Sequence, residues 1–244
     1  SPLPPPTVES TSPPPTVTSP PPPPPPPTVE STPPPPAVES LAHSVCGPYA
    51  VHARAAITFA GPQSTIHGGD MGVSPGTAIT GNFAFAGGGH VVSTPDSAAF
   101  AASVLVAHTA AMVPRADGQA MAIEMGGVTF TPGTYRSGSA INFAFGTVVT
   151  LDGLNEPNPV FLFQALSTLV TAASTSFVLK NGARADNVLW ALGTAATLGA
   201  NSVLPGSILA GSAITFGTKA ELLGCALAKT AITFESAGSV SLPQ

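Results

Sequence analysis

Residues 213–234 read AITFGTKAELLGCALAKTAITF, a stretch that begins and ends with the same four residues, 18 positions apart. Each copy alternates a small or hydroxyl side chain with a large apolar one, the pattern of a strand with one buried side. A step near 20 residues is typical of one coil of a three-sided β-solenoid, in which each side contributes a strand of about five residues. The stretch therefore predicts a mostly β fold of stacked coils.

The motif recurs along the chain when each short strand is aligned on a threonine or an asparagine. From Thr168 onward the aligned steps are 29, 18 and 18 residues. The seven predicted rungs are Ala56-Ile57-Thr58-Phe59, Ala78-Ile79-Thr80-Gly81, Ala140-Ile141-Asn142-Phe143, Leu166-Ser167-Thr168-Leu169, Ala195-Ala196-Thr197-Leu198, Ala213-Ile214-Thr215-Phe216 and Ala231-Ile232-Thr233-Phe234. We expect these rungs to stack roughly 4.7–4.9 Å apart.

Strand alternation decides which side chains of each rung face solvent. Isoleucine and phenylalanine must be buried, so the alanine and the threonine of each rung point outward. The predicted outer residues are Thr58, Thr80, Asn142, Thr168, Thr197, Thr215 and Thr233, with Ala56, Ala78, Ala140, Ala195, Ala213 and Ala231. Threonine is also an ordinary residue of exposed strands. Exposed strands usually carry Lys, Glu, Gln and Arg as well, however, and these rungs carry none, which indicates a functional face.

One segment follows a helical period instead. Thr94, Pro95 and Asp96 supply an N-cap, a proline in the first turn and an acid near the helix N-terminus. Apolar residues then recur at helical spacing up to Met112, and Pro114 ends the pattern. We predict a single long helix over about 95–113, packed alongside the solenoid, and this helix lengthens the step between Thr80 and Asn142.

The first 40 residues differ in composition from the rest. They hold 19 of the 29 prolines and repeat PPPTVEST-like blocks with few large apolar side chains. Such a segment cannot bury enough surface to offset its ordering entropy, and its proline runs favour polyproline II. We predict a proline-rich spacer over 1–40 and one folded domain over 41–244. The blocks also resemble hydroxyproline-rich wall glycoproteins, which would imply wall association or O-glycosylation.

Charge and apolar runs exclude several kinds of partner. Only 8% of the residues are charged, and three of the twelve acids, Glu9, Glu30 and Glu39, lie in the proline-rich segment. The sequence contains no basic patch to bind nucleic acid or anionic lipid, and no apolar run approaches the ~20 residues of a membrane helix. It also has no initiator methionine and no signal peptide, as expected of a mature or trimmed chain.

No pattern of side chains indicates catalysis, a metal or a cofactor. The histidines at 43, 52, 67, 90 and 108 lack metal-ligand spacing. Gly87-Gly88-Gly89 lacks the lysine of a phosphate-binding loop. Glycan-cleaving solenoids need clustered carboxylates, whereas four acids are isolated beside turn residues and fit turn or cap roles: Asp70, Asp152, Glu156 and Asp186. Cys46 and Cys225 are either a disulfide closing the domain end to end or two buried thiols.

Longer stretches of the domain carry a resemblance to a known family. These stretches are Gly69–Gly81, Thr129–Tyr135, Pro159–Gln164 with Ser167–Leu169, Asn187–Trp190 with Ala196–Gly199, Gly206–Ala210 and Ala226–Lys229. Together they resemble the ice-binding proteins of microalgae, fungi and bacteria. The resemblance covers nearly all of 46–240 and leaves the proline-rich segment outside. It implies a discontinuous right-handed β-solenoid with an adjacent helix, in which the coils do not stack in sequence order.

The resemblance also implies a flat ice-binding face with the pattern Thr-Ala/Gly-any-Thr/Asn. Three segments meet it, beginning at Thr77, Thr194 and Thr230, and those beginning at Ser139 and Ser212 nearly do; Leu166 and Ser167 depart from it. In this family an early strand inserts beside late coils, which would bring Cys46 next to Cys225. We therefore predict a secreted, monomeric, non-enzymatic protein that adsorbs to ice, giving thermal hysteresis and inhibiting recrystallisation.

A second hypothesis remains at this point, a non-enzymatic extracellular wall or matrix protein that binds glycan or another chain. Sugar binding would require exposed aromatic rings. The chain has one tryptophan and two tyrosines, and Trp190 lies within an apolar strand. This composition favours the first hypothesis.

Overall fold

The computed structural model describes residues 2–3 and 44–243. The chain divides into two units, 1–34 and 35–244, and the second contains every helix and strand named below. The spacer predicted over 1–40 lies outside the described residues, apart from Pro2 and Leu3. The prediction of a boundary near residue 40 therefore stays a prediction.

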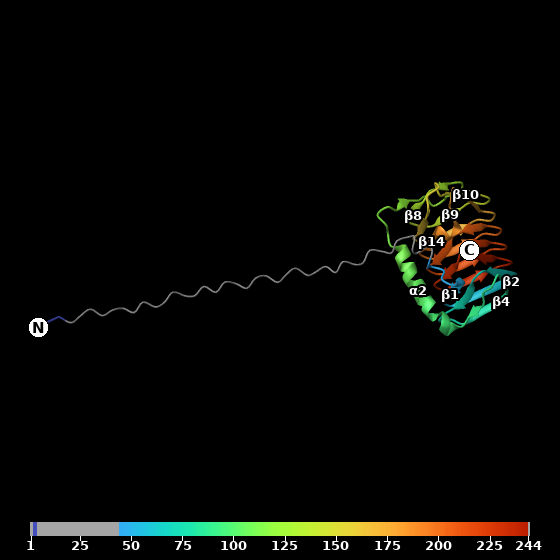
Figure 1. Ribbon diagram of the computed structural model, residues 1–244, viewed down its shortest axis with the longest axis horizontal. Helices are drawn as coiled ribbons and strands as arrows, with labels where there is room; N and C mark the ends of the chain where they lie inside the picture. Colours follow the sequence, from blue (N-terminus) through green and yellow to red (C-terminus); the bar gives the residue numbers. More distant parts are fainter. Residues whose placement is uncertain (1, 4–43, 244) are drawn as a thin grey trace. The chain divides into compact units, whose positions relative to one another are not determined.

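The second unit is a mostly β solenoid whose paired strands are all parallel, with one long helix packed against it (Figure 1). One sheet lies under the helix, and we call it the helix face. Its strands, in spatial order, are β5 (Val91–Val92), β3 (Asp70–Val73), β1 (Tyr49–Ala53), β20 (Ala226–Ala228), β17 (Ser207–Ala210), β14 (Val188–Leu192), β11 (Phe161–Ala165), β8 (Gly133–Ser137) and β6 (Gln119–Ala120).

The other two sides are formed by the remaining strands. A ten-stranded sheet has the order β16 (Val203–Pro205), β19 (Glu221–Leu223), β22 (Ser239–Ser241), β2 (Ala56–His67), β21 (Ala231–Phe234), β18 (Ile214–Phe216), β15 (Ala196–Leu198), β12 (Leu169–Thr171) and β9 (Ile141–Phe143), with β4 (Ala78–Ala86) also paired to β2. A three-stranded sheet has the order β13 (Ser176–Lys180), β10 (Val148–Asp152) and β7 (Thr129–Phe130). A short 3-10 helix, η1 (Ala185–Asn187), precedes β14.

The coils do not stack in sequence order, as the resemblance implies. The early strands β1 and β2 pair with the late strands β20 and β21. In Figure 1 the blue and cyan strands β1, β2 and β4 accordingly lie beside the red end of the chain. The long strand β2 turns a corner, because Ala56–Phe59 pair with β21 and Thr65–His67 pair with β22.

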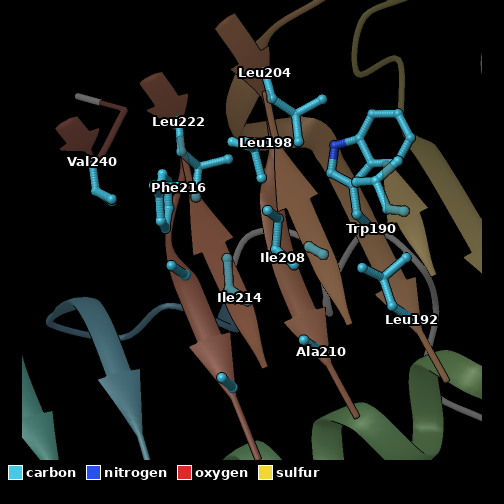
Figure 2. Close-up of a cluster of buried hydrophobic side chains, with 14 of the residues drawn as sticks. Trp190, Leu192, Leu198, Leu204, Ile208, Ala210, Ile214, Phe216, Leu222 and Val240 are labelled. Carbon is cyan, nitrogen blue, oxygen red and sulfur yellow. The ribbon is translucent and has the colours of Figure 1, made fainter. Parts of the chain in front are cut away.

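The interior is filled by the apolar residues of each rung. Ile57, Ile214 and Ile232 are fully buried, as their alternation predicts. Phenylalanine rings stack through neighbouring coils, with Phe216 4.3 Å and Phe59 4.7 Å from Phe234 between ring centroids. Figure 2 shows Trp190 packed among aliphatic side chains of adjacent strands. Its indole donates to the Pro205 carbonyl at 2.8 Å, so the one tryptophan belongs to the core.

The helix α2 spans Thr94–Met112, close to the predicted range. Its N-cap is Ser93, one residue earlier than predicted: the Ser93 hydroxyl accepts from the Asp96 backbone N–H, whereas the Thr94 hydroxyl donates to the Gly76 carbonyl. Further side-chain hydrogen bonds join the helix to the solenoid. His108 bonds the Leu192 carbonyl at 2.8 Å, and buried Gln164 donates to the Ala111 and Val113 carbonyls at the helix C-terminus.

Cys46 and Cys225 form a disulfide between residues 179 positions apart, with Cα atoms at 5.6 Å. The bridge joins the segment before β1 to the start of β20, two strands that pair side by side. Cys225 is fully buried in an apolar cluster between α2 and the helix face, and we call it the helix-facing cluster. Its other buried members are Val45, Val104, Ala111, Leu162, Leu189, Ala191, Leu209 and Leu227. Of the two alternatives left by the sequence, the structure has the disulfide.

Candidate functional site

One side of the solenoid carries an ordered array of small and hydroxyl side chains, and we call it the threonine face. It consists of β9, β12, β15, β18, β21 and the first parts of β2 and β4. Its outer column runs Thr80, Thr58, Thr233, Thr215 and Thr197, each in register with the next. The column continues with Val170 and Asn142.

A second outer column lies two residues earlier in each rung. Ala78, Ala56 and Ala231 are in register, and Ala213, Ala195 and Ala140 occupy the corresponding positions of the other coils. Before them lies a further row of mostly hydroxyl residues, which contains Thr77, Ala55, Thr230, Ser212, Thr194, Ser167 and Ser139. Backbone hydrogen bonds between adjacent coils align this row. Ser212 N donates to the Thr194 carbonyl at 2.7 Å, and Ala55 N donates to the Thr230 carbonyl at 2.7 Å.

The predicted rung Leu166-Ser167-Thr168-Leu169 is wrong by two residues. Leu169 pairs with Ala196, so Val170 lies opposite Thr197, and Thr168 lies in the alanine column. A shift of two keeps the same side chains outward, which is why the alternation did not expose the error. In the corrected rung, Thr171 takes the inner position that Leu198 and Phe143 hold in the neighbouring coils. Thr171 is buried, and its hydroxyl accepts from the Gly199 N–H at 3.0 Å.

An eighth rung was missed. Residues Ala122-Ile123-Glu124-Met125 run beside β9, with Glu124 bridged to Asn142 and Met125 N donating to the Asn142 carbonyl. Glu124 therefore ends the threonine column, and its carboxylate accepts from the backbone N–H of Ala144 at 2.9 Å. The small-Ile-any-large pattern could have revealed this rung, but alignment on threonine or asparagine excluded it.

Exposure and charge distinguish the threonine face from the other sides of the solenoid. Thr80 and Thr197 are exposed, and Thr58, Thr215 and Thr233 are half-buried between their neighbours. No charged residue lies in the outer columns between Asn142 and Thr80. The third side, formed by β7, β10, β13, β16, β19, β22 and the second parts of β2 and β4, carries Lys180 and Glu221. The helix face is covered by α2.

Of the four isolated acids predicted to fill turn or cap roles, Asp152 and Asp186 make local contacts of that kind, whereas Asp70 joins two separate segments. Asp70 accepts from the His90 N–H, Asp186 pairs with Arg184, and Asp152 accepts from the Leu154 N–H. The Leu154 bond, followed by one from Asn181, lowers the pKa of the Asp152 carboxyl. The Leu154 and Arg184 contacts are local, and Asp70 joins the start of β3 to the loop before β5, which favours a structural role over catalysis.

Other candidate sites lie away from the threonine face. A hollow of about 500 Å³ is lined by residues that include Arg184, Asp186 and Leu223, at the edge of the third side. Within residues 2–3 and 44–243, no three side chains of His, Cys, Asp or Glu are grouped to hold a metal ion. No helix in the same ranges is long and apolar enough to cross a membrane.

The fold and this face define a class, a β-solenoid that presents one uncharged surface of residues aligned in register. A family model described as Ice-binding-like matches residues 51–239, and the chain belongs to this family. A crystal structure of an ice-binding protein from the Antarctic ascomycete Antarctomyces psychrotrophicus has a TM-score of 0.74 at 34% identity, covering 82% of this chain and 97% of that one. Another, from an Antarctic biological consortium, has a TM-score of 0.74 at 30% identity, covering 83% and 90%.

Curated relatives give the same result over shorter lengths. An ice-binding protein of Nostoc sp. strain HG1 is 38% identical over 144 residues, which are 57% of this chain and 51% of that protein. One of Lentinula edodes is 34% identical over 185 residues, which are 67% of this chain and 62% of that protein. The matched region thus spans about half to two thirds of these relatives. The matches support the ice-binding hypothesis over the matrix alternative.

Proposed function

We propose that this chain binds ice through the threonine face and acts by adsorption, without catalysis. The observation that carries the proposal is the unbroken register of Thr80, Thr58, Thr233, Thr215 and Thr197 on an uncharged face. Family membership and relatives named ice-binding proteins support it.

The geometry of the face explains how adsorption can work. Neighbouring parallel strands lie roughly 4.7–4.9 Å apart, so the hydroxyl groups repeat at a regular spacing set by the backbone. The methyl groups of threonine and alanine offer the adjacent water no hydrogen-bond partner, so this water forms an ordered layer. The threonine hydroxyl groups hydrogen-bond to the ordered layer and anchor it. Such water-mediated contacts are nearly as favourable in enthalpy as direct hydrogen bonds.

Rigidity makes many weak contacts additive. Apart from those of the edge strand β4, the outer residues lie on strands that pair on both sides and pack on buried isoleucine and phenylalanine rows. Binding therefore orders few side chains, and little of the contact energy is lost to conformational entropy. Adsorbed molecules would pin the growing ice front, which would produce thermal hysteresis and slow recrystallisation.

We further propose that the protein is secreted and acts as a monomer. The Cys46–Cys225 disulfide supports the first part, because structural disulfides persist in oxidising compartments. The scarcity of charge also fits an extracellular protein that adsorbs to a neutral surface.

The direct test places a bulky side chain at the centre of the face. Thr215→Tyr should abolish most thermal hysteresis while far-UV circular dichroism stays unchanged, because the ring would project from a flat surface. Thr150→Tyr is the matched control, since Thr150 is an equally half-buried outer residue of the third side. A folded Thr215→Tyr protein with full hysteresis would move the site to another face. A wild-type protein without hysteresis or recrystallisation inhibition would end the proposal.

A further inference from the structure

The threonine column changes chemistry at one rung. Five consecutive positions from Thr80 to Thr197 carry a hydroxyl, and the sixth carries Val170. Beyond it lie Asn142 and the terminal Glu124. The face is therefore continuous in backbone register but interrupted in hydrogen-bonding capacity.

The interruption is chemical rather than geometric. Val170 pairs in register with Thr197 on one side and with Asn142 on the other, so the strand ladder passes through it unchanged. Valine and threonine are both β-branched and differ by a methyl group in place of a hydroxyl. At Val170, an ordered water layer therefore meets a methyl group that can neither donate nor accept a hydrogen bond.

Two exposed apolar side chains also lie at the edges of the face here, one in the coil of Val170 and one in the neighbouring coil of Asn142. Leu166 occupies the corner position that Gly193 and Gly211 hold in the next two coils, and its side chain is 46% exposed. At the opposite corner, Phe145 follows β9 and is 74% exposed. Large apolar side chains thus project beside the part of the face that lies beyond the threonine array.

The far end of the column is charged. The Glu124 carboxylate is bound to backbone N–H groups of Ala144 and Gly126, which hold it at the end of the sheet. A carboxylate keeps a strong hydration shell of its own. Asn142 therefore lies between a methyl group and a charge, separated from the five-threonine array.

We infer that the ice-contacting patch is confined to the five rungs from Thr80 to Thr197, and that Val170 sets its boundary and limits its affinity for ice. This inference rests on the proposed function and adds which part of the face binds. It places three of the predicted outer residues outside the binding patch: Asn142 of the threonine column, and Thr168 and Ala140 of the alanine column.

A shape-conserving exchange tests the boundary. Val170→Thr should extend the array to a sixth hydroxyl and join Asn142 to it. One additional net hydrogen bond corresponds to about a fivefold gain in adsorption affinity. The readouts are thermal hysteresis at equal protein concentration and the concentration that gives half-maximal recrystallisation inhibition. The reverse exchange, Thr215→Val, should lower both activities.

Two controls make the outcomes separable. Val178→Thr introduces the same hydroxyl on the third side, at a position 38% exposed, and should change nothing. Val170→Thr with unchanged activity, or an equal gain from Val178→Thr, overturns the boundary. If the boundary is overturned in this way but Thr215→Tyr abolishes activity in the same assays, the proposed function still stands. If Thr215→Tyr stays fully active, the proposed function fails together with the inference.

Discussion

Thr58 and Thr233 lie side by side in register on neighbouring parallel strands, although they come from opposite ends of the described chain. Their neighbours Thr80 and Thr215 extend the column in both directions. The face is therefore assembled from coils that are distant in sequence, and its middle depends on an early strand inserted beside the last rung.

Because Thr58 and Thr233 are adjacent, Thr58→Tyr and Thr233→Tyr should each remove most thermal hysteresis, and the double substitution should cost little more. Both rings would obstruct the same patch, so their effects should not add. Thr65→Tyr serves as the control, since Thr65 lies on the same strand β2 but on the third side. Equal losses for Thr65→Tyr would indicate a folding defect. Additive losses for the adjacent pair would argue against one shared patch.

Removing the disulfide should lower stability but spare the face. In the chain-entropy model, a closed loop of 179 residues stabilises the fold by about 5 kcal/mol at most. We expect Cys46→Ser with Cys225→Ser to lower the midpoint of thermal unfolding clearly and to keep ice binding near 0 °C, because the bridge lies by the helix-facing cluster. Reductant should shift the wild-type midpoint and leave that of the double variant unchanged. A wild-type midpoint insensitive to full reduction would contradict this prediction.

Stability should fall under mildly acidic conditions because two histidines are buried where α2 packs on the helix face, His52 on β1 and His108 on α2 itself. Burial lowers the pKa of His52 to about 4 from 6.5 and also lowers the pKa of His108. The unfolded chain therefore takes up protons first as the pH falls, so stability is fully present above about pH 6.5 and decreases towards pH 4. For His52 the loss is about 3 kcal/mol at most.

Urea unfolding at several pH values measures this dependence, and His52→Phe should flatten the profile between pH 6.5 and 4. The ring of His52 packs on Tyr49 and Phe100, so phenylalanine suits the same apolar contacts. An unfolding free energy of the wild type that is constant across this range would refute the prediction.

Gln164 should be important for stability despite lying far from the threonine face. Its buried amide donates to the Ala111 and Val113 carbonyls at 2.6 and 2.9 Å, and its carbonyl accepts from Arg136. Gln164→Leu leaves these groups without partners and should cost about 2–4 kcal/mol in unfolding free energy. Exposed Gln63→Leu should change it by less than about 0.5 kcal/mol. A loss of similar size in both variants would refute the assigned role.

The proline-rich segment should be dispensable for ice binding. Every strand of the solenoid begins after it, as does the family match over residues 51–239. A chain that starts at Ala42 should fold and retain the thermal hysteresis of the full chain at equal molar concentration. A shortened protein that is folded, as judged by circular dichroism, but inactive would show that the segment is more than a spacer.

Sequence reasoning was most accurate where side-chain alternation decides the answer. The small-Ile-Thr-Phe rungs of β18 and β21 bury isoleucine and phenylalanine and leave threonine outside, as predicted. The helix was also predictable, because its period of 3.6 residues and its proline in the first turn differ from the surrounding strands. The resemblance to ice-binding proteins added the displaced early coils and the pairing of Cys46 with Cys225.

The errors came from positions that alternation does not constrain. The rung at Thr168 was shifted by two residues, which conserves the inward and outward sides, and only the pairing of Leu169 with Ala196 reveals the shift. The rung at Glu124 was missed because the residue that ends the column is not a threonine.

The sequence by itself determined that the chain forms stacked strands with an uncharged threonine-bearing side, because burial of apolar side chains imposes the two-residue period locally. Only the tertiary structure decided the register between coils and the order in which they stack. Both depend on backbone hydrogen bonds and inner packing between strands distant in the chain, such as Thr58 with Thr233, and turns of unequal length hide these pairings from sequence spacing. For the same reason, the structure alone revealed Val170 as the position where the threonine array ends.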